Sequence, residues 1–348
     1  LLVPFFIFLG VLSLTSVITA ATESLVGFVL DGTIHADAPS LFVTQLSLAA
    51  IVSFIFPLFV FNYKFGIRRA DFYKQLPFAP KQFRRTMFTL GFLMLITTVT
   101  FVFSLSVIIY AIRYFTFDVS TLQENQVFLS FNGAYIFYFY LLLILTCFVT
   151  YSIACLFVHH NVSIFESIIT VIAAEIVMNL LIFAISKQIY IFSSYNISSY
   201  YSFGIVASFM SGLYLNYQMI GVESYLGNIS TILNLVFSAI CGIGAFIYLM
   251  FAKDRSADKE NEKGRPTILT LISIHGALFT LLIFFNTLSV ISYFSTGVIV
   301  YDAFILVIFF FIQILYRHNF KLRLSQWIPF ASIALFGIID FILIQSLI

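Results

Sequence analysis

The 348-residue chain is 61% hydrophobic and only 9% charged, with a mean hydropathy of +1.06 and a net charge of +2. Soluble domains are about 45–50% apolar and about 25% charged, so this composition excludes a water-soluble globular domain. The small net charge gives no indication of nucleic-acid binding, and the positions of the charges are more informative than their sum.

Long apolar runs follow one another along the chain, and each is long enough to cross a hydrocarbon core of roughly 30 Å as a helix. The chain is apolar from Leu1 onward and shows no charged flank or cleavage site, so we expect it to begin within a span and not with a signal peptide. The sequence therefore predicts an all-α, polytopic integral membrane protein with about nine transmembrane helices. The predicted spans are 1–22, 42–62, 88–111, 134–158, 163–187, 230–251, 267–292, 298–316 and 327–347.

Basic residues are concentrated in three of the connections between spans. All but two of the 17 Lys and Arg residues lie in 63–87, 252–265 and 316–326, whereas loops on the opposite side carry acidic residues. Cytoplasmic loops of membrane proteins hold an excess of Lys and Arg. If the first span runs outward, all three segments fall in the cytoplasm, and a miscount of one span in the middle would place one outside. The pattern therefore predicts orientation as well as span count.

Segment 63–87, between the second and third spans, is the most informative stretch. Apolar side chains recur every third residue within 67–76 while charged residues occupy the other sides, which predicts a short amphipathic helix on the membrane surface. Pro77 and Pro80 should end it in a rigid elbow, because proline lacks a backbone donor and restricts the residue before it. The basic residues that follow, Lys81, Arg84 and Arg85, are then expected to meet the lipid phosphates as the third span begins.

The run A-D-F-Y-K-Q-L-P-F-A-P-K-Q-F at 70–83 carries a specific resemblance. It is similar to the D-x-x-x-S-L-P-x-x-R signature after the second span of permeases of Gram-positive ABC exporters, including the phenol-soluble modulin and cell-envelope antibiotic exporters. Gln75 stands where Ser is usual, and Lys81 lies one place from the usual Arg. A weaker likeness is N-E-K-G-R-P at 261–266, which resembles the S-E-K-A-G-K-P tract after the sixth span of those permeases. The likeness covers the layout of residues 1–270.

The resemblance implies a type-2 ABC exporter-like core of six spans in 1–252, a charged cytoplasmic linker at 253–266 and three extra spans in 267–348. It also implies that helix 67–76 is a coupling helix seated in an ATPase groove. The aromatic and apolar part of loop 188–229 would form a partly re-entrant outer gate, with a misplaced span end as the alternative. The implied coupling residues are Arg68, Arg69, Asp71, Phe72, Tyr73, Lys74, Leu76, Pro77, Phe78 and Lys81, and the implied gate residues are Tyr201, Phe203, Phe209 and Met210.

By this resemblance the chain is a permease subunit that exports an amphipathic peptide, antibiotic or lipid-like cargo across the bacterial plasma membrane. The sequence holds no G-x-x-x-x-G-K-[ST] run, so we expect no enzyme activity and no cofactor in this chain. ATP and Mg would be bound by partner ABC ATPase subunits. A second permease, identical or homologous, and membrane lipids are the other expected partners, and nucleic acid is not one.

Acidic residues within the spans offer a second interpretation. Glu166 and Glu175 lie nine residues apart in the fifth span and so point to nearly opposite faces. Glu175 is the deeper one, where a charge costs about 2.5–3.5 kcal/mol, so it should line the translocation path or bond a neighbouring helix. Glu166, near the cytoplasmic end, is either exposed to water or part of the same path. An ion-coupled secondary carrier would instead use Glu175, Asp302 and Asp340.

The remaining polar residues give no metal site. His159 and His160 are adjacent and point about 100° apart on a helix, so they cannot bind a metal as an i, i+4 pair would, and interfacial packing is expected. His275 is a lone imidazole in the seventh span, for which packing is also expected. The three cysteines lie in apolar runs without metal spacing. Because no His and acidic residues converge at one depth, a membrane enzyme is disfavoured.

Overall fold

The structure is a computed structural model of the chain. It describes residues 2–22, 29–30, 33–35, 39–62, 65, 75, 79–116, 126–128, 133–161, 164–193, 229–251, 268–291, 300, 303–311 and 324–345.

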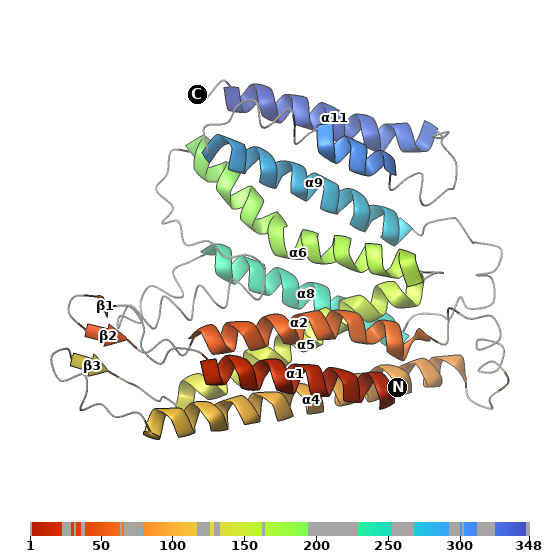
Figure 1. The fold of residues 1–348 in the computed structure, drawn as a ribbon. Helices are drawn as coiled ribbons and strands as arrows, with labels where there is room; N and C mark the ends of the chain where they lie inside the picture. Colours follow the sequence, from red (N-terminus) through yellow and green to blue (C-terminus); the bar gives the residue numbers. More distant parts are fainter. Residues whose placement is uncertain are drawn as a thin grey trace.

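The described chain is predominantly helical, and a helical stretch falls on every predicted span (Figure 1). The helical class of the fold is thus confirmed. Residues 303–311 form the helical stretch within the predicted eighth span. The other helices are α1 (Leu2–Thr22), α2 (Pro39–Val60), α4 (Pro80–Thr116), α5 (Gly133–His160), α6 (Ile164–Ser193), α8 (Ile229–Phe251), α9 (Ile268–Ile291) and α11 (Leu324–Gln345).

Two helices extend clearly past their predicted bounds. Helix α4 begins at Pro80 and not at 88, because proline is accepted in the first turn of a helix, where its missing N–H would have no partner. Helix α6 continues to Ser193, past the predicted end at 187, because neither Gly nor Pro interrupts 188–193. The early start of α4 brings the basic residues that follow the elbow into the helix.

A small sheet is the exception to the all-α prediction. It consists of β1 (Val29–Leu30), β2 (Thr33–His35) and β3 (Gln126–Phe128) in the order β1-β2-β3. Strand β1 pairs antiparallel with β2, and β2 pairs parallel with β3. The sheet links the connection after α1 to the connection after α4, beyond the ends of the helices (Figure 1). Strands this short leave no alternating pattern from which to predict them.

Two of the described helical stretches are long and apolar enough to cross a membrane. They are Lys81–Ile112 in α4, in which an 18-residue part has a mean hydropathy of 2.5, and Leu143–His160 in α5, with a mean hydropathy of 1.7. Of the residues in that 18-residue part of α4, 33% are buried within the protein, against 72% in the α5 stretch. Helix α5 is therefore the central helix, packed against α2, α4, α6 and α8, and α4 lies at the periphery.

Three hydrophobic clusters follow one another across the molecule. The first joins α1, α2, α4, α5 and the end of α8, the second joins α5, α6 and α8, and the third joins α6, α9, 303–311 and α11. Each cluster shares a helix with the next, and α6 and α9 form the most extensive helix pair. The helices consequently lie as successive layers from α4 and α1 to α11 (Figure 1).

Candidate functional site

The predicted coupling helix 67–76 lies outside the described residues except for Gln75, which is exposed. Of the implied coupling residues, only Lys81 is described, and it is exposed on the first turn of α4. The residues that lie outside the described part are Arg68, Arg69, Asp71, Phe72, Tyr73, Lys74, Leu76, Pro77 and Phe78.

The start of α4 is capped by the elbow residue in front of it. The backbone carbonyl of Ala79 accepts hydrogen bonds from the amides of Gln82, at 2.9 Å, and Phe83, at 3.1 Å. Pro80 occupies the first helical position, where its fixed φ suits the helix. Helix α4 therefore begins at the last residue of the predicted elbow.

Arg84 is the largest fully buried side chain described, with only 1% of its surface exposed. Its Nε donates to the backbone carbonyl of Leu249 at 3.0 Å, and its Nη1 lies 3.5 Å from Nε2 of His159. A buried guanidinium needs such hydrogen bonds, because the cost of removing it from water is otherwise uncompensated. The prediction that Arg84 meets lipid phosphates is therefore wrong, since its side chain turns inward between α4, α5 and α8.

Arg85 binds the next carbonyl along α8. Its Nε and Nη2 both donate to the backbone oxygen of Met250, at 3.0 and 2.7 Å. Helix α8 ends at Phe251, so this carbonyl and that of Leu249 belong to its last turn, where carbonyls lack partners within the helix. The negative end of the helix dipole also favours cations there. The two arginines of α4 thus cap the C-terminus of α8.

Aromatic rings continue the contact beneath the arginines. The Phe88 ring lies 5.1 Å from that of Tyr151 and 5.6 Å from that of Phe246, and the Tyr151 hydroxyl donates to the Phe88 carbonyl at 3.1 Å. Three helices thereby meet in one hydrogen-bonded contact, which we call the arginine junction. It comprises Arg84, Arg85 and Phe88 of α4, Tyr151 and His159 of α5, and Phe246, Leu249 and Met250 of α8.

The histidines take part in packing contacts. The rings of His159 and His160 lie 5.7 Å apart at 78°, and His160 lies 5.1 Å from Tyr248. His275 contacts Phe309 at 5.2 Å between ring centroids. Within the described ranges no three His, Cys, Asp or Glu residues are grouped so that they could hold a metal ion. The described contacts of the arginine junction are hydrogen bonds and ring packing.

The predicted path, gate and carrier residues fall largely outside the described part. Glu166 is half-buried on the first turn of α6, and its backbone carbonyl accepts a hydrogen bond from Thr170 at 2.6 Å. Helices α6 and α11 contain Glu175 and Asp340, whose side chains are not described, and Asp302 lies outside the described residues. Their roles stay predictions. The same holds for the implied gate residues, all of which lie outside the described part: Tyr201, Phe203, Phe209 and Met210.

A polar bridge that was not predicted joins the turn after α5 to α9. The buried Asn161 donates from Nδ2 to Thr170 Oγ1 at 3.1 Å and accepts from Thr270 Oγ1 at 2.7 Å. Asn161 lies between the predicted fourth and fifth spans, so the sequence shows a polar residue in a turn and nothing more. Its partner Thr270 is 109 residues away, a pairing that no local pattern reveals.

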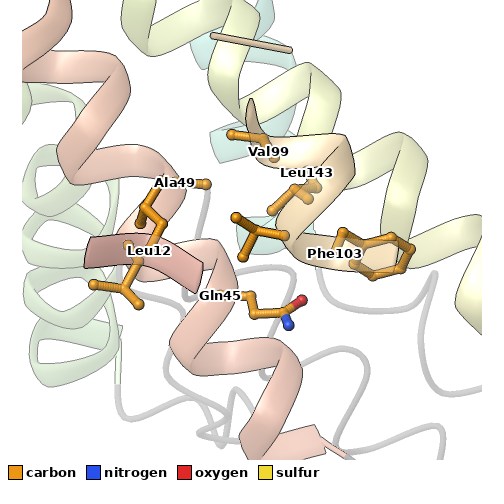
Figure 2. Close-up of a pocket in the computed structure, with 8 residues that line it drawn as sticks. Leu12, Gln45, Ala49, Val99, Phe103 and Leu143 are labelled. Carbon is orange, nitrogen blue, oxygen red and sulfur yellow. The ribbon is translucent and has the colours of Figure 1, made fainter. Parts of the chain in front are cut away.

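A second missed feature is a small cavity between α1, α2, α4 and α5 (Figure 2). Its polar lining residue is Gln45, which is 5% exposed, and both side-chain amide atoms lack a hydrogen-bond partner among the described residues. The signal in the sequence is one amide in an otherwise apolar run. The rest of the lining is apolar: Leu12, Leu48, Ala49, Val99, Val102, Phe103 and Leu143.

No protein family, curated protein or solved structure matches the chain. The exporter interpretation accordingly depends on the residue pattern at 70–83, the layout of the spans and the geometry of the arginine junction.

Proposed function

We propose that the chain is a multi-pass protein of the bacterial plasma membrane, with about nine spans, that acts as a permease subunit of an ATP-driven exporter. The observation that carries this proposal is the arginine junction. The predicted coupling segment directly precedes α4 in the sequence, and the first turns of α4 are bonded to the last turn of α8 and to α5.

Exposed apolar side chains support the membrane part of the proposal. Leu14 of α1, Phe115 of α4 and Leu335 of α11 are 63%, 76% and 61% exposed, and many other large apolar residues share this exposure. Extended apolar surface is unfavourable in water and normally marks an interaction site or a lipid contact. Since such residues occur on helices at both edges of the molecule, lipid is the medium that suits them best.

The arginine junction supports the transmission part. Coupling between distant sites needs a contiguous set of packed and hydrogen-bonded elements. Arg84 and Arg85 bind two successive carbonyls of α8, and Tyr151 binds α4 one turn further along. A displacement of the elbow at Pro80 would therefore move the ends of α4, α5 and α8 together. When nucleotide binding closes the partner ATPases, the surface helix 67–76 would pass the motion to these three helices.

The cargo would occupy the space between this permease and a second one. An amphipathic peptide, antibiotic or lipid-like molecule is the class that the resemblance implies. The ATPase and Mg-nucleotide would belong to partner subunits, which fits a chain whose described site offers hydrogen bonds and packing.

The first experiment measures association with an ATPase. A tagged chain should co-purify with an ATP-hydrolysing subunit, and replacing Asp71 and Leu76 together by Ala should abolish that association. Lys74→Cys should react with a membrane-impermeant maleimide only from the cytoplasmic side. Labelling from outside, or unchanged association of the double variant, would contradict the proposal.

The second experiment separates attachment from transmission. Arg85→Gln loses the charged bond to Met250, so the purified complex should keep its ATPase but lose the stimulation of ATP turnover by the membrane subunit. Thr89→Ala, one turn along on the exposed side of α4, is the matched control and should keep it. If the chain transports ions or solutes alone in liposomes, the secondary carrier with Glu175, Asp302 and Asp340 replaces this proposal.

A further inference from the structure

A cationic and aromatic patch lies on the exposed surface of the arginine junction, where α4 begins and α8 ends. Nζ of Lys81 and the guanidinium carbon of Arg85 each lie 5.8 Å from the centroid of the Phe251 ring. Lys81 is exposed, and Phe251 is 71% exposed. Among the residues that the structure describes, neither cation forms an ion pair with a carboxylate. The patch therefore presents two positive charges on one exposed ring.

Arg85 retains hydrogen-bonding capacity after capping α8. Its Nε and Nη2 each donate to Met250 O, whereas a guanidinium carries five N–H donors in a planar fork. Such a fork matches the geometry of phosphate oxygens, and hydrogen bonds between charged groups are among the strongest in proteins. The capping bonds also fix the orientation of the guanidinium, so little side-chain entropy is lost when an anion binds.

An apolar stripe runs from this patch along α8. Its residues recur every three or four positions, as neighbours on one helix face do. The stripe is about 22 Å long at 1.5 Å per residue, which exceeds half of a hydrocarbon core of roughly 30 Å. An acyl chain of one leaflet fits along it. The members are Val236, Ile240, Ile243, Ile247 and Phe251, which are 44%, 64%, 50%, 50% and 71% exposed.

We infer that this surface is a binding site for an anionic phospholipid. The phosphate lies against Lys81 and Arg85, and an acyl chain lies along the apolar stripe of α8. The inference depends on the proposed membrane placement of the chain. Basic side chains at the cytoplasmic boundary attract anionic lipids, and here they stand at the water end of an exposed apolar helix face. A small soluble anion would make no contact with the apolar stripe of α8.

The site has a consequence for transmission. A lipid phosphate bound to Lys81 and Arg85 would lie against the same side chain that holds the end of α8. Anionic lipid would therefore strengthen the connection between the elbow and α8, and transmission through the arginine junction would depend on lipid composition.

The test measures lipid binding to the purified full chain, with native mass spectrometry as the readout. Phosphatidylglycerol and phosphatidylcholine with identical acyl chains are titrated onto delipidated protein. The wild type should prefer phosphatidylglycerol by about tenfold, and Lys81→Gln should reduce that preference about fivefold. Combining Phe251→Leu with Lys81→Gln should reduce the preference for phosphatidylglycerol further. Gln82→Ala, exposed on the same turn, and Phe115→Leu, at the far end of α4, are matched controls that should leave it unchanged.

Several results would overturn the inference. Equal binding of the two lipids, or an unchanged preference in Lys81→Gln, would remove the site. Full displacement of the lipid by millimolar inorganic phosphate would indicate a site for free anions. If Lys81→Gln instead converted a dimer to a monomer with the lipid preference intact, the patch would be a subunit interface. A chain that binds phosphatidylglycerol selectively but associates with no ATPase would retain this site and lose the proposed function.

Discussion

The orientation of Arg84 shows how a single residue can escape prediction. Arg84 and Arg85 are neighbours in a basic tract at the start of a span, where contact with lipid phosphates is the ordinary expectation. Adjacent residues on a helix point about 100° apart, so Arg84 and Arg85 can have different surroundings. Arg84 bonds instead to a carbonyl 165 residues away. That partner could not be identified from the local sequence.

Arg84→Met should lower the free energy of unfolding by about 1–3 kcal/mol, because the Leu249 carbonyl loses a buried donor. Thermal unfolding in mild detergent measures this effect. Thr86→Met, an exposed change two residues away, should leave the midpoint nearly unchanged. Equal midpoints for wild type and Arg84→Met would show that the carbonyl is satisfied in another way.

Gln45→Leu should have the opposite sign and raise stability by about 1–2 kcal/mol. The buried amide of Gln45 lacks a protein partner among the described residues, and burying such a group without one is costly. Ser106→Ala is the control, since this buried serine donates to the Val102 carbonyl at 3.0 Å and its loss should be neutral or mildly destabilising. If Gln45→Leu destabilised the protein, the amide would have to bind a group in the cavity.

The helices were predictable to the extent that they depend on apolar length. A run of apolar residues in a chain of this composition must satisfy its backbone hydrogen bonds internally, and a helix does so within one segment. Every predicted span accordingly contains a described helical stretch. The starting point of α4 was not predicted, because Pro80 was interpreted as interrupting a helix, whereas it occupies the first turn of one. The helix pairs were not predicted, because similar apolar faces can pack on one another in many ways.

Glycines mark where helices approach closely, and α8 offers a matched pair. A Cβ on Gly242 would lie 2.8 Å from Cγ2 and 3.0 Å from Cα of Val149 in α5, whereas a Cβ on Gly244 would meet no atom within 4 Å. Gly242→Ala should therefore destabilise the protein by about 1–3 kcal/mol through overpacking. Gly244→Ala should stabilise it by up to about 1 kcal/mol through helix propensity. Thermal midpoints in detergent compare the two. Equal effects would mean that α8 can shift away from α5 without cost.

The whole molecule is built by passing contacts from helix to helix. Helix α5 shares one cluster with α4 and another with α8, and α6 joins that second cluster to the one around α9. The predicted division at 253–266 therefore separates segments that pack together through α6 and α9. The sequence indicated a charged linker there, but the face on which the following helices dock depends on Asn161 and Thr270, which are distant in sequence.

Cleavage within 253–266 should therefore leave the two halves associated. A protease site inserted there yields fragments that end after α8 and begin before α9. They should migrate together in mild detergent, because α9 packs along α6 and Asn161 bonds to both Thr170 and Thr270. Asn161→Leu removes both bonds and takes this acceptor from the buried Thr270 hydroxyl, so it should weaken the association by about 1–3 kcal/mol.

The control for this experiment is Thr280→Ala. Thr280 is as buried as Thr270, but it donates to the Gly276 carbonyl of its own helix, so its loss should leave the association unchanged. Wild-type fragments that separate on cleavage would show that the linker alone holds the halves together. Because the three hydrophobic clusters share helices, association without the linker would instead mean that packed side chains and the Asn161 bonds hold α9 to the rest of the molecule.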